Sequence, residues 1–185
     1  TYLSEAMIIM KKFGDRQAEI QVYSNLGKAY LKLKSYPMAI KYFNRALKYY
    51  REIGDSSSVS HTTCELGEIY FELNDYISSR NFFTSGLEMA VSIKDIVNEV
   101  RNMTGLAKLY VRFKDTETAG NFLKKAEVLA RHRMSFKELS KIFEIYSEIH
   151  AATGNTKEAK LYISKHYDCL KELVCMDEES KINAI

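Results

Sequence analysis

Residues 26–46 read LGKAYLKLKSYPMAIKYFNRA, and their spacing of small and large residues recurs at a fixed interval along the chain. The first motif is Leu26-Gly27-x-x-Tyr30, Leu66-Gly67-x-x-Tyr70, Leu106-Ala107-x-x-Tyr110 and Tyr146-Ser147-x-x-His150. The second motif places a large apolar residue between two others that are mostly small: Ala39/Phe43/Ala46, Ser79/Phe83/Gly86, Ala119/Leu123/Ala126 and Ala159/Ile163/His166. Both motifs recur every 40 residues. A fixed period of this size predicts stacked helical repeats.

Helix caps recur with the same period and divide each unit into two helices. N-cap side chains accept hydrogen bonds from the unpaired N–H groups that begin a helix. Such residues precede the first helices at Asp15, Asp55, Asp95 and Ser135, and the second helices at Ser35, Asp75, Asp115 and Asn155. Ser135-x-x-Glu138 also has the form of a capping box, and Gly14, Gly54 and Gly154 stand where a helix can end in a left-handed residue. We expect eight capped helices of about 14 to 20 residues.

Together the two motifs resemble the tetratricopeptide repeat family, a helix-turn-helix repeat marked by Leu-Gly-x-x-Tyr in its first helix and Ala-x-x-x-Phe-x-x-Ala in its second. The resemblance weakens in the last unit, where His150 and His166 replace the family's tyrosine and alanine. It implies an all-α fold, an α-solenoid of about four repeats that forms a right-handed superhelix. The family's basic unit has about 34 residues. The longer period here is similar to the long-helix variant of bacterial signalling proteins.

The period also predicts the boundaries of the repeats. We expect four of them, at residues 15–54, 55–94, 95–134 and 135–174. Leu3 and Ala6 stand one full period before Phe43 and Ala46, so residues 1–13 are expected to be the second helix of a truncated preceding repeat. Residues 175–185 are expected to form a C-terminal capping or linker helix. The chain is therefore expected to be a piece of a longer protein.

Composition narrows the class of protein. The 185 residues are 46% apolar and carry a formal net charge of +3, which is too small to predict a nucleic-acid partner. The sequence has no apolar run of about 20 residues, so no membrane partner is predicted. Three cysteines, an odd number, argue against a disulfide framework and favour a reducing compartment, which indicates a cytoplasmic location.

Sequence motifs of catalytic sites are missing. There is no Gly-rich phosphate loop, His-Glu-x-x-His, nucleophile elbow or Asp-rich calcium loop, so we predict a protein that is not an enzyme and has no cofactor. His61 and Cys64 lie about one helical turn apart, a spacing that could offer two metal ligands. No second pair stands nearby in the sequence, so no metal site is predicted.

Charge alternates between the predicted first helices. In the family the residue after each Leu-Gly pair points toward a concave groove, and the resemblance places Lys28, Glu68, Lys108 and Glu148 there. The positions four residues later hold Lys32, Glu72, Arg112 and Ala152. Two interpretations stay open: a ladder of surface ion pairs, each contributing about 0–1 kcal/mol, or a groove patterned for a ligand of mixed charge.

The same face supplies the candidate binding residues. Asn25 carries a donor and an acceptor that suit the backbone of an extended peptide. The predicted peptide-binding groove comprises Asn25, Lys28, His61, Glu65, Glu68, Phe71, Arg101, Thr104, Lys108 and Arg112. The expected partner is a protein or peptide of mixed charge, and a homo-oligomer is left open.

The C-terminal residues 164–185 carry a second resemblance, to the exit of tetratricopeptide sensor regions in bacterial signalling proteins. The hypothesis we favour is a protein- or peptide-binding module that serves as the sensory or scaffolding region of a larger signalling protein. One alternative is a structural spacer or oligomerisation element whose groove is filled by its own chain. Another is the peptide-pheromone receptor region of a transcription regulator.

Overall fold

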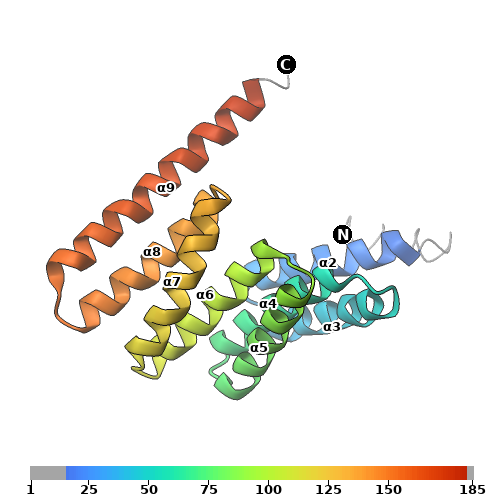
Figure 1. The fold of residues 1–185 in the computed structure, drawn as a ribbon. Coiled ribbons are helices and arrows are strands. Elements are labelled where there is room, and N and C mark those ends of the chain that lie inside the picture. The colour runs from blue at the N-terminus through green and yellow to red at the C-terminus, as the bar shows by residue number, and fades with distance from the viewer. Residues whose placement is uncertain (1–15, 183–185) are drawn as a thin grey trace. The chain divides into compact units, whose positions relative to one another are not determined.

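The computed structural model of the chain describes residues 16–182, and within that range all regular structure is α-helical (Figure 1). The helices are α2 (Arg16–Lys32), α3 (Tyr36–Glu52), α4 (Ser56–Glu72), α5 (Tyr76–Ser92), α6 (Ile96–Arg112), α7 (Thr116–His132), α8 (Phe136–Ala152) and α9 (Thr156–Ile182). The predicted all-α helical repeat fold is confirmed. The helix expected at residues 1–13 lies outside the described residues. The handedness of the superhelix and the repeat boundaries stay predictions.

The helices form two compact units. Unit 1 ends at Asn98, within the first turn of α6, and unit 2 begins at Glu99. In unit 1, α2 packs against α3, α3 against α4 and α4 against α5. In unit 2, α7 packs against α8 and α8 against α9. Each helix is thus held chiefly by its neighbours in the sequence, as in other repeat proteins.

One turn type joins the helices of the described part of the chain. Each turn contains a residue with positive φ: Lys34, Gly54, Asn74, Lys94, Lys114, Met134 and Gly154. The next residue donates its N–H to a carbonyl five residues back, as Ser35 does to Tyr30 over 2.9 Å, which is the closing bond of a Schellman motif. That residue is also the N-cap of the following helix. Because the turns recur at equal intervals of the sequence, helices α2 to α8 have 17 residues each and begin at equal intervals.

Most predicted caps form the expected hydrogen bonds. The carboxylates of Asp55, Asp75 and Asp115 each accept from the N–H three residues later, over 3.0 Å. The capping box predicted at Ser135 and Glu138 is wrong: the Ser135 side chain makes no cap bond among the described residues. The Glu138 carboxylate instead accepts from the Arg101 guanidinium.

The cap residue before α6 also binds the start of α4, through residues that all belong to unit 1. Asp95 accepts from the Asn98 N–H over 3.1 Å and from the Ser57 hydroxyl, at the start of α4, over 2.5 Å. The Asn98 side chain completes the link by donating to the Ser57 carbonyl over 3.2 Å. Partial burial acts to raise the pKa of Asp95, but the hydrogen bonds from Ser57 and Asn98 outweigh it and the pKa is lowered.

The last helix is longer than the sequence predicts. Helix α9 has 27 residues and runs past position 175, where a separate C-terminal helix was expected (Figure 1). The turn period would place a left-handed residue at Val174 and an N-cap at Cys175. A β-branched side chain strongly disfavours positive φ, and cysteine is not a capping residue. The helix therefore continues.

The core of each of the first three repeats contains a close contact between its two helices. A Cβ added to Gly27 would lie 2.7 Å from the Phe43 ring, and one added to Gly67 would lie 2.8 Å from the Phe83 ring. The corresponding residues of the third repeat are Ala107 with Leu123, both fully buried. Where alanine replaces the smaller glycine, leucine thus replaces the larger phenylalanine. The predicted role of the Leu-Gly motif in helix packing is explained by this size matching.

We expect Gly67→Ala to lower the free energy of unfolding by about 1–3 kcal/mol, the usual cost of overpacking a core. Adding Phe83→Leu, which recreates the Ala-Leu pair of the third repeat, should recover part of that loss. Gly120→Ala is the control, since a Cβ there meets nothing within 4 Å; it should stabilise α7 through helix propensity. Urea denaturation measures all variants. Additive losses in the double variant would contradict the size matching.

Substitutions in the turns test the left-handed residues. We expect Met134→Gly to raise the free energy of unfolding by about 1 kcal/mol, because glycine adopts positive φ without a clash of Cβ. Gly154→Ala is the matched change in the same unit: its φ is +78° and no atom lies within 4 Å of the added Cβ. It should lower stability by a similar amount. Destabilisation by Met134→Gly would show that the Met134 side chain, rather than its backbone, matters at this turn.

Candidate protein-binding surfaces

The predicted groove residues of α2 lie on its surface with local contacts. Asn25 is exposed, and its side-chain oxygen accepts from the Gln21 amide over 3.5 Å, at the limit of a hydrogen bond. Lys28 is half-buried. Since one weak contact within the same helix costs little to break, the amide of Asn25 is open to a peptide backbone.

The α4 residues form a second group in unit 1. Glu68 is exposed, while His61, Glu65 and Phe71 are half-buried. His61 Nε2 lies 3.5 Å from Glu65 Oε1, one turn along the helix, and the Phe71 ring packs at 5.7 Å from that of Tyr76. The histidine and carboxylate thus form a local pair whose charge depends on protonation of the imidazole.

Unit 2 departs from the predicted groove at two of its four positions. The Thr104 side chain is buried and donates to the Val100 carbonyl over 2.7 Å, so it does not line an exposed surface. It is buried because position 104 lies one turn after Val100, itself in the core. Arg101 donates through Nε to Oε1 of the buried Glu138 over 3.2 Å. Lys108 and Arg112 are exposed, as predicted for groove residues.

The alternating charges interact in one unit. In unit 2, partial burial and the neighbouring Glu144 carboxylate raise the pKa of Glu148, and the Lys108 ammonium acts to lower it. Lys108 on α6 therefore lies close enough to Glu148 on α8 for their charges to interact. In unit 1, no ion pair within the described residues joins Lys28 to Glu68. Within the described residues of unit 2, the Lys108–Glu148 rung of the ion-pair ladder is supported.

The raised pKa of Glu148 gives a pH prediction. Its folded pKa lies above the unfolded value, so the carboxyl contributes stability that is present below about pH 4.3 and is lost as the pH rises through the folded pKa. We expect Glu148→Gln to melt at a higher temperature than wild type at about pH 7 and at the same temperature near pH 3. The difference should be small because Glu148 is exposed to solvent. The control is Glu88→Gln, an exposed glutamate of α5. An equal difference at both pH values would rule out titration of Glu148 as the cause.

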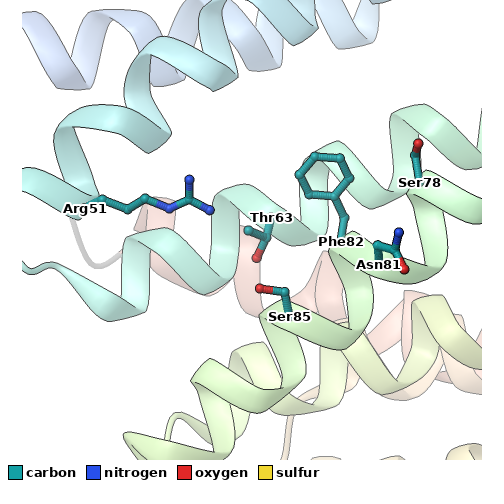
Figure 2. Close-up of a pocket in the computed structure, with 6 residues that line it drawn as sticks. All are labelled: Arg51, Thr63, Ser78, Asn81, Phe82 and Ser85. Atoms are coloured by element: carbon teal, nitrogen blue, oxygen red, sulfur yellow. The ribbon is translucent and has the colours of Figure 1, made fainter.

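A pocket in unit 1 lies away from the predicted groove. It has a volume of about 300 Å³ and is lined by Arg51 of α3, Thr63 of α4 and Ser78, Asn81, Phe82 and Ser85 of α5 (Figure 2). Thr63 follows His61 and precedes Glu65 by two residues each, about 200° around α4, so the pocket lies on the side of α4 opposite those two groove residues.

Sequence reasoning missed this pocket because it considered only the first helices, whereas five of the six lining residues belong to second helices. One signal was available. Ser85 is the only small residue in its repeat position, where the other three units carry Arg45, Lys125 and Lys165. A small residue at a position otherwise filled by a long one indicates a local gap.

Neither a metal site nor a membrane span is found in the described part of the chain. Within residues 16–182, no three His, Cys, Asp or Glu side chains gather in a way that would hold a metal ion. His61 pairs with Glu65, and Cys64 is buried. Over the same residues no helix is both long and apolar enough to cross a bilayer.

Comparison with known proteins agrees with the repeat and its fold. The profile of the tetratricopeptide repeat matches residues 1–52 and 18–92. The crystal structure of BtubC (BKLC) from P. vanneervenii superposes with a TM-score of 0.73 at 18% sequence identity, covering 92% of this chain and 71% of that one. At this identity the likeness concerns the fold alone. No curated protein matches the chain in sequence. The recurring motifs, the paired helices and the matching profile together show that the chain belongs to the tetratricopeptide repeat family.

Proposed function

We propose that this chain is a non-enzymatic module that binds a protein or peptide of mixed charge along its first helices. Tetratricopeptide repeats act as protein-interaction modules, and the family membership supports that role here. The observation that carries the proposal is the polar surface of the first helices: Asn25 and Glu68 in unit 1, and Lys108 and Arg112 in unit 2, are exposed. Both signs of charge are present, which suits a peptide better than a polyanion.

The wider setting belongs to the same proposal. We infer that the module is the sensory or scaffolding region of a larger signalling protein in the cytoplasm. The long helix α9 supports this setting, because an unbroken helix is a common way to join a binding module to another domain. Arg101 and Thr104 are not part of the proposed surface, since one is paired with Glu138 and the other is buried.

The alternative role, as an oligomerisation element, is favoured by one feature. Helix α9 carries exposed apolar side chains at Ile163, Tyr167, Leu170 and Val174, at intervals of four, three and four residues. This spacing is that of a coiled-coil seam. A second copy of the chain would bury the stripe by pairing through α9.

Selection from a random peptide library tests the proposed function. We expect the folded chain to enrich peptides that carry both signs of charge. Asn25→Ala and Lys108→Ala should each weaken binding of an enriched peptide by about three- to tenfold, as expected for the loss of one hydrogen bond or charged contact. Lys41→Ala, an exposed lysine on α3, should leave binding unchanged.

The outcome separates the two roles. Calorimetry measures the affinities, and circular dichroism checks that the variants keep their helix content. Failure to enrich any peptide, together with a dimer in sedimentation that Leu170→Glu dissociates, would favour the oligomerisation element. Equal effects of the Lys41 and Lys108 changes would show that the first-helix surface is not the binding site.

A further inference from the structure

Each repeat contains a stacked pair of rings, one from each helix, with a site for a further side chain beside the pair. In every repeat a residue of the first helix stacks on a ring of the second: Tyr30 on Tyr42 at 5.5 Å, Tyr70 on Phe82 at 5.2 Å, Tyr110 on Phe122 at 5.8 Å and His150 on Tyr162 at 5.4 Å. In the first and fourth repeats a further first-helix residue, Tyr23 or Phe143, lies next to the same second-helix ring, and the equivalent positions of the other two repeats are 63 and 103. The residue at that position differs between the repeats.

In the first and fourth repeats this place is filled by a ring and a cation. The Tyr23 ring lies 6.1 Å from Tyr42, and the Arg45 guanidinium lies 5.4 Å from the Tyr23 centroid. In the fourth repeat Phe143 lies 6.0 Å from Tyr162. The Lys165 ammonium lies over both rings, 5.7 Å and 4.6 Å from their centroids.

The fourth repeat adds a second cation. The Arg131 guanidinium of α7 lies 5.5 Å from the centroid of Phe143. The Phe143 ring is therefore placed among one aromatic neighbour and two cations, all within the range of aromatic pairing and cation–π attraction. This cluster shows what an aromatic ring meets at this position of the repeat.

In the second repeat the positions of these cations and rings are only partly occupied. Thr63 stands at the position of Phe143, and Ser85 stands at the position of Lys165. Phe82 keeps the position of Tyr162, and Arg51 keeps that of Arg131. The pocket of about 300 Å³ lies among these four residues. Figure 2 shows the Arg51 side chain extending toward Thr63, with Phe82 and Ser85 beyond it on α5.

The Arg51 guanidinium and the Phe82 ring line this pocket, and each could contact a further aromatic ring. Within the described residues, the Arg51 guanidinium pairs with no carboxylate and lies over no aromatic ring. Phe82 stacks on Tyr70 but has no ring at position 63. The Thr63 hydroxyl already donates to carbonyls of its own helix, over 3.0 Å to Val59 and 2.8 Å to Ser60, so it does not require a polar ligand.

We propose that this pocket of the second repeat takes an aromatic side chain, phenylalanine or tyrosine, from a bound protein segment. The ligand's ring occupies the place that Phe143 holds in the fourth repeat, between the Phe82 ring and the Arg51 guanidinium. Asn81 and Ser85, both exposed, stand at the rim, where their polar atoms can bind the ligand's backbone. The volume lies at the lower end of the range for ligand sites, about 300 Å³ and upward, which suits one side chain.

The Arg51 guanidinium and the Phe82 ring favour an aromatic side chain over other side chains. An aliphatic side chain would gain no cation–π attraction from Arg51, and a cationic side chain would be repelled by it. The inference rests on the proposed function as a protein-binding module. It adds an anchor on the side of α4 opposite the groove residues His61 and Glu65.

Nuclear magnetic resonance with a small probe tests the pocket directly. N-acetyl-phenylalaninamide, added to the full chain, should shift the backbone amide signals of Ser78, Asn81, Phe82 and Ser85. N-acetyl-leucinamide is the matched aliphatic probe and should shift them far less. Arg51→Ala should weaken binding of the aromatic probe by about two- to fivefold, as expected for one cation–π contact at a partly exposed site. Equal shifts with both probes, or none at these residues, would overturn the proposal.

Two variants change the pocket from within. Thr63→Phe supplies the ring of the fourth repeat and should abolish the shifts caused by the aromatic probe. Ser85→Lys supplies, at an exposed position, the cation that lies over the Phe143 ring in the fourth repeat, and should strengthen binding of the aromatic probe by about two- to fivefold, even where Thr63→Phe folds poorly. Thr84→Lys, the exposed neighbour, is the control and should leave the shifts unchanged. Binding of the aromatic probe by Ser85→Lys that is no tighter than binding by Thr84→Lys would overturn the proposal.

The peptide library distinguishes this inference from the proposed function. If the pocket is an anchor, enriched peptides share an aromatic residue at a fixed position and lose affinity for the Thr63→Phe variant. If peptides are enriched without a shared aromatic residue, the proposed function stands and the pocket inference fails. If none is enriched, the proposed function fails, and the small-probe measurement alone decides the pocket.

Discussion

The hydrogen bond that closes each turn sets the spacing of the whole chain. In every described turn the N-cap residue of one helix donates its N–H to the end of the preceding helix, so a single residue completes two helices at once. Lengthening the turn would sacrifice either the cap or the closing bond. Turns of equal length recur at equal intervals of the sequence, and residues one repeat apart therefore occupy equivalent places. The recurring stack of Tyr70 on Phe82 and its counterparts follows from this constraint.

Much of the fold could be predicted from sequence because its determinants are local. Caps such as Asp55 and Asp115 act within one turn of the backbone, and the glycine of Leu66-Gly67 acts through a partner at a fixed distance in sequence. Helix α9 continues because Val174 and Cys175 are not of the residue types that stop one helix and begin the next. The repeat period by itself predicts a turn at these two positions.

The candidate surfaces were less predictable because side-chain contacts between helices decide them. Arg101 has the right position for a groove residue, but the buried Glu138 of α8 takes its side chain. Thr104 has the right polarity, but its place on α6 is buried. The pocket beside Phe82 arises from what Thr63 and Ser85 lack relative to their counterparts. Such a gap is visible only when equivalent positions of a folded repeat are compared.

The unbroken helix α9 has a mechanical consequence. At about 1.5 Å per residue its 27 residues span about 40 Å. Its N-terminal part packs against α8, and Cys169 is the last of its described side chains that is buried. A helix bends little over such a length, so a small tilt of its packed end becomes a larger sideways displacement at the far end. Because α9 continues past Val174, a change in its packing against α8 produces a displacement that grows with distance along the helix.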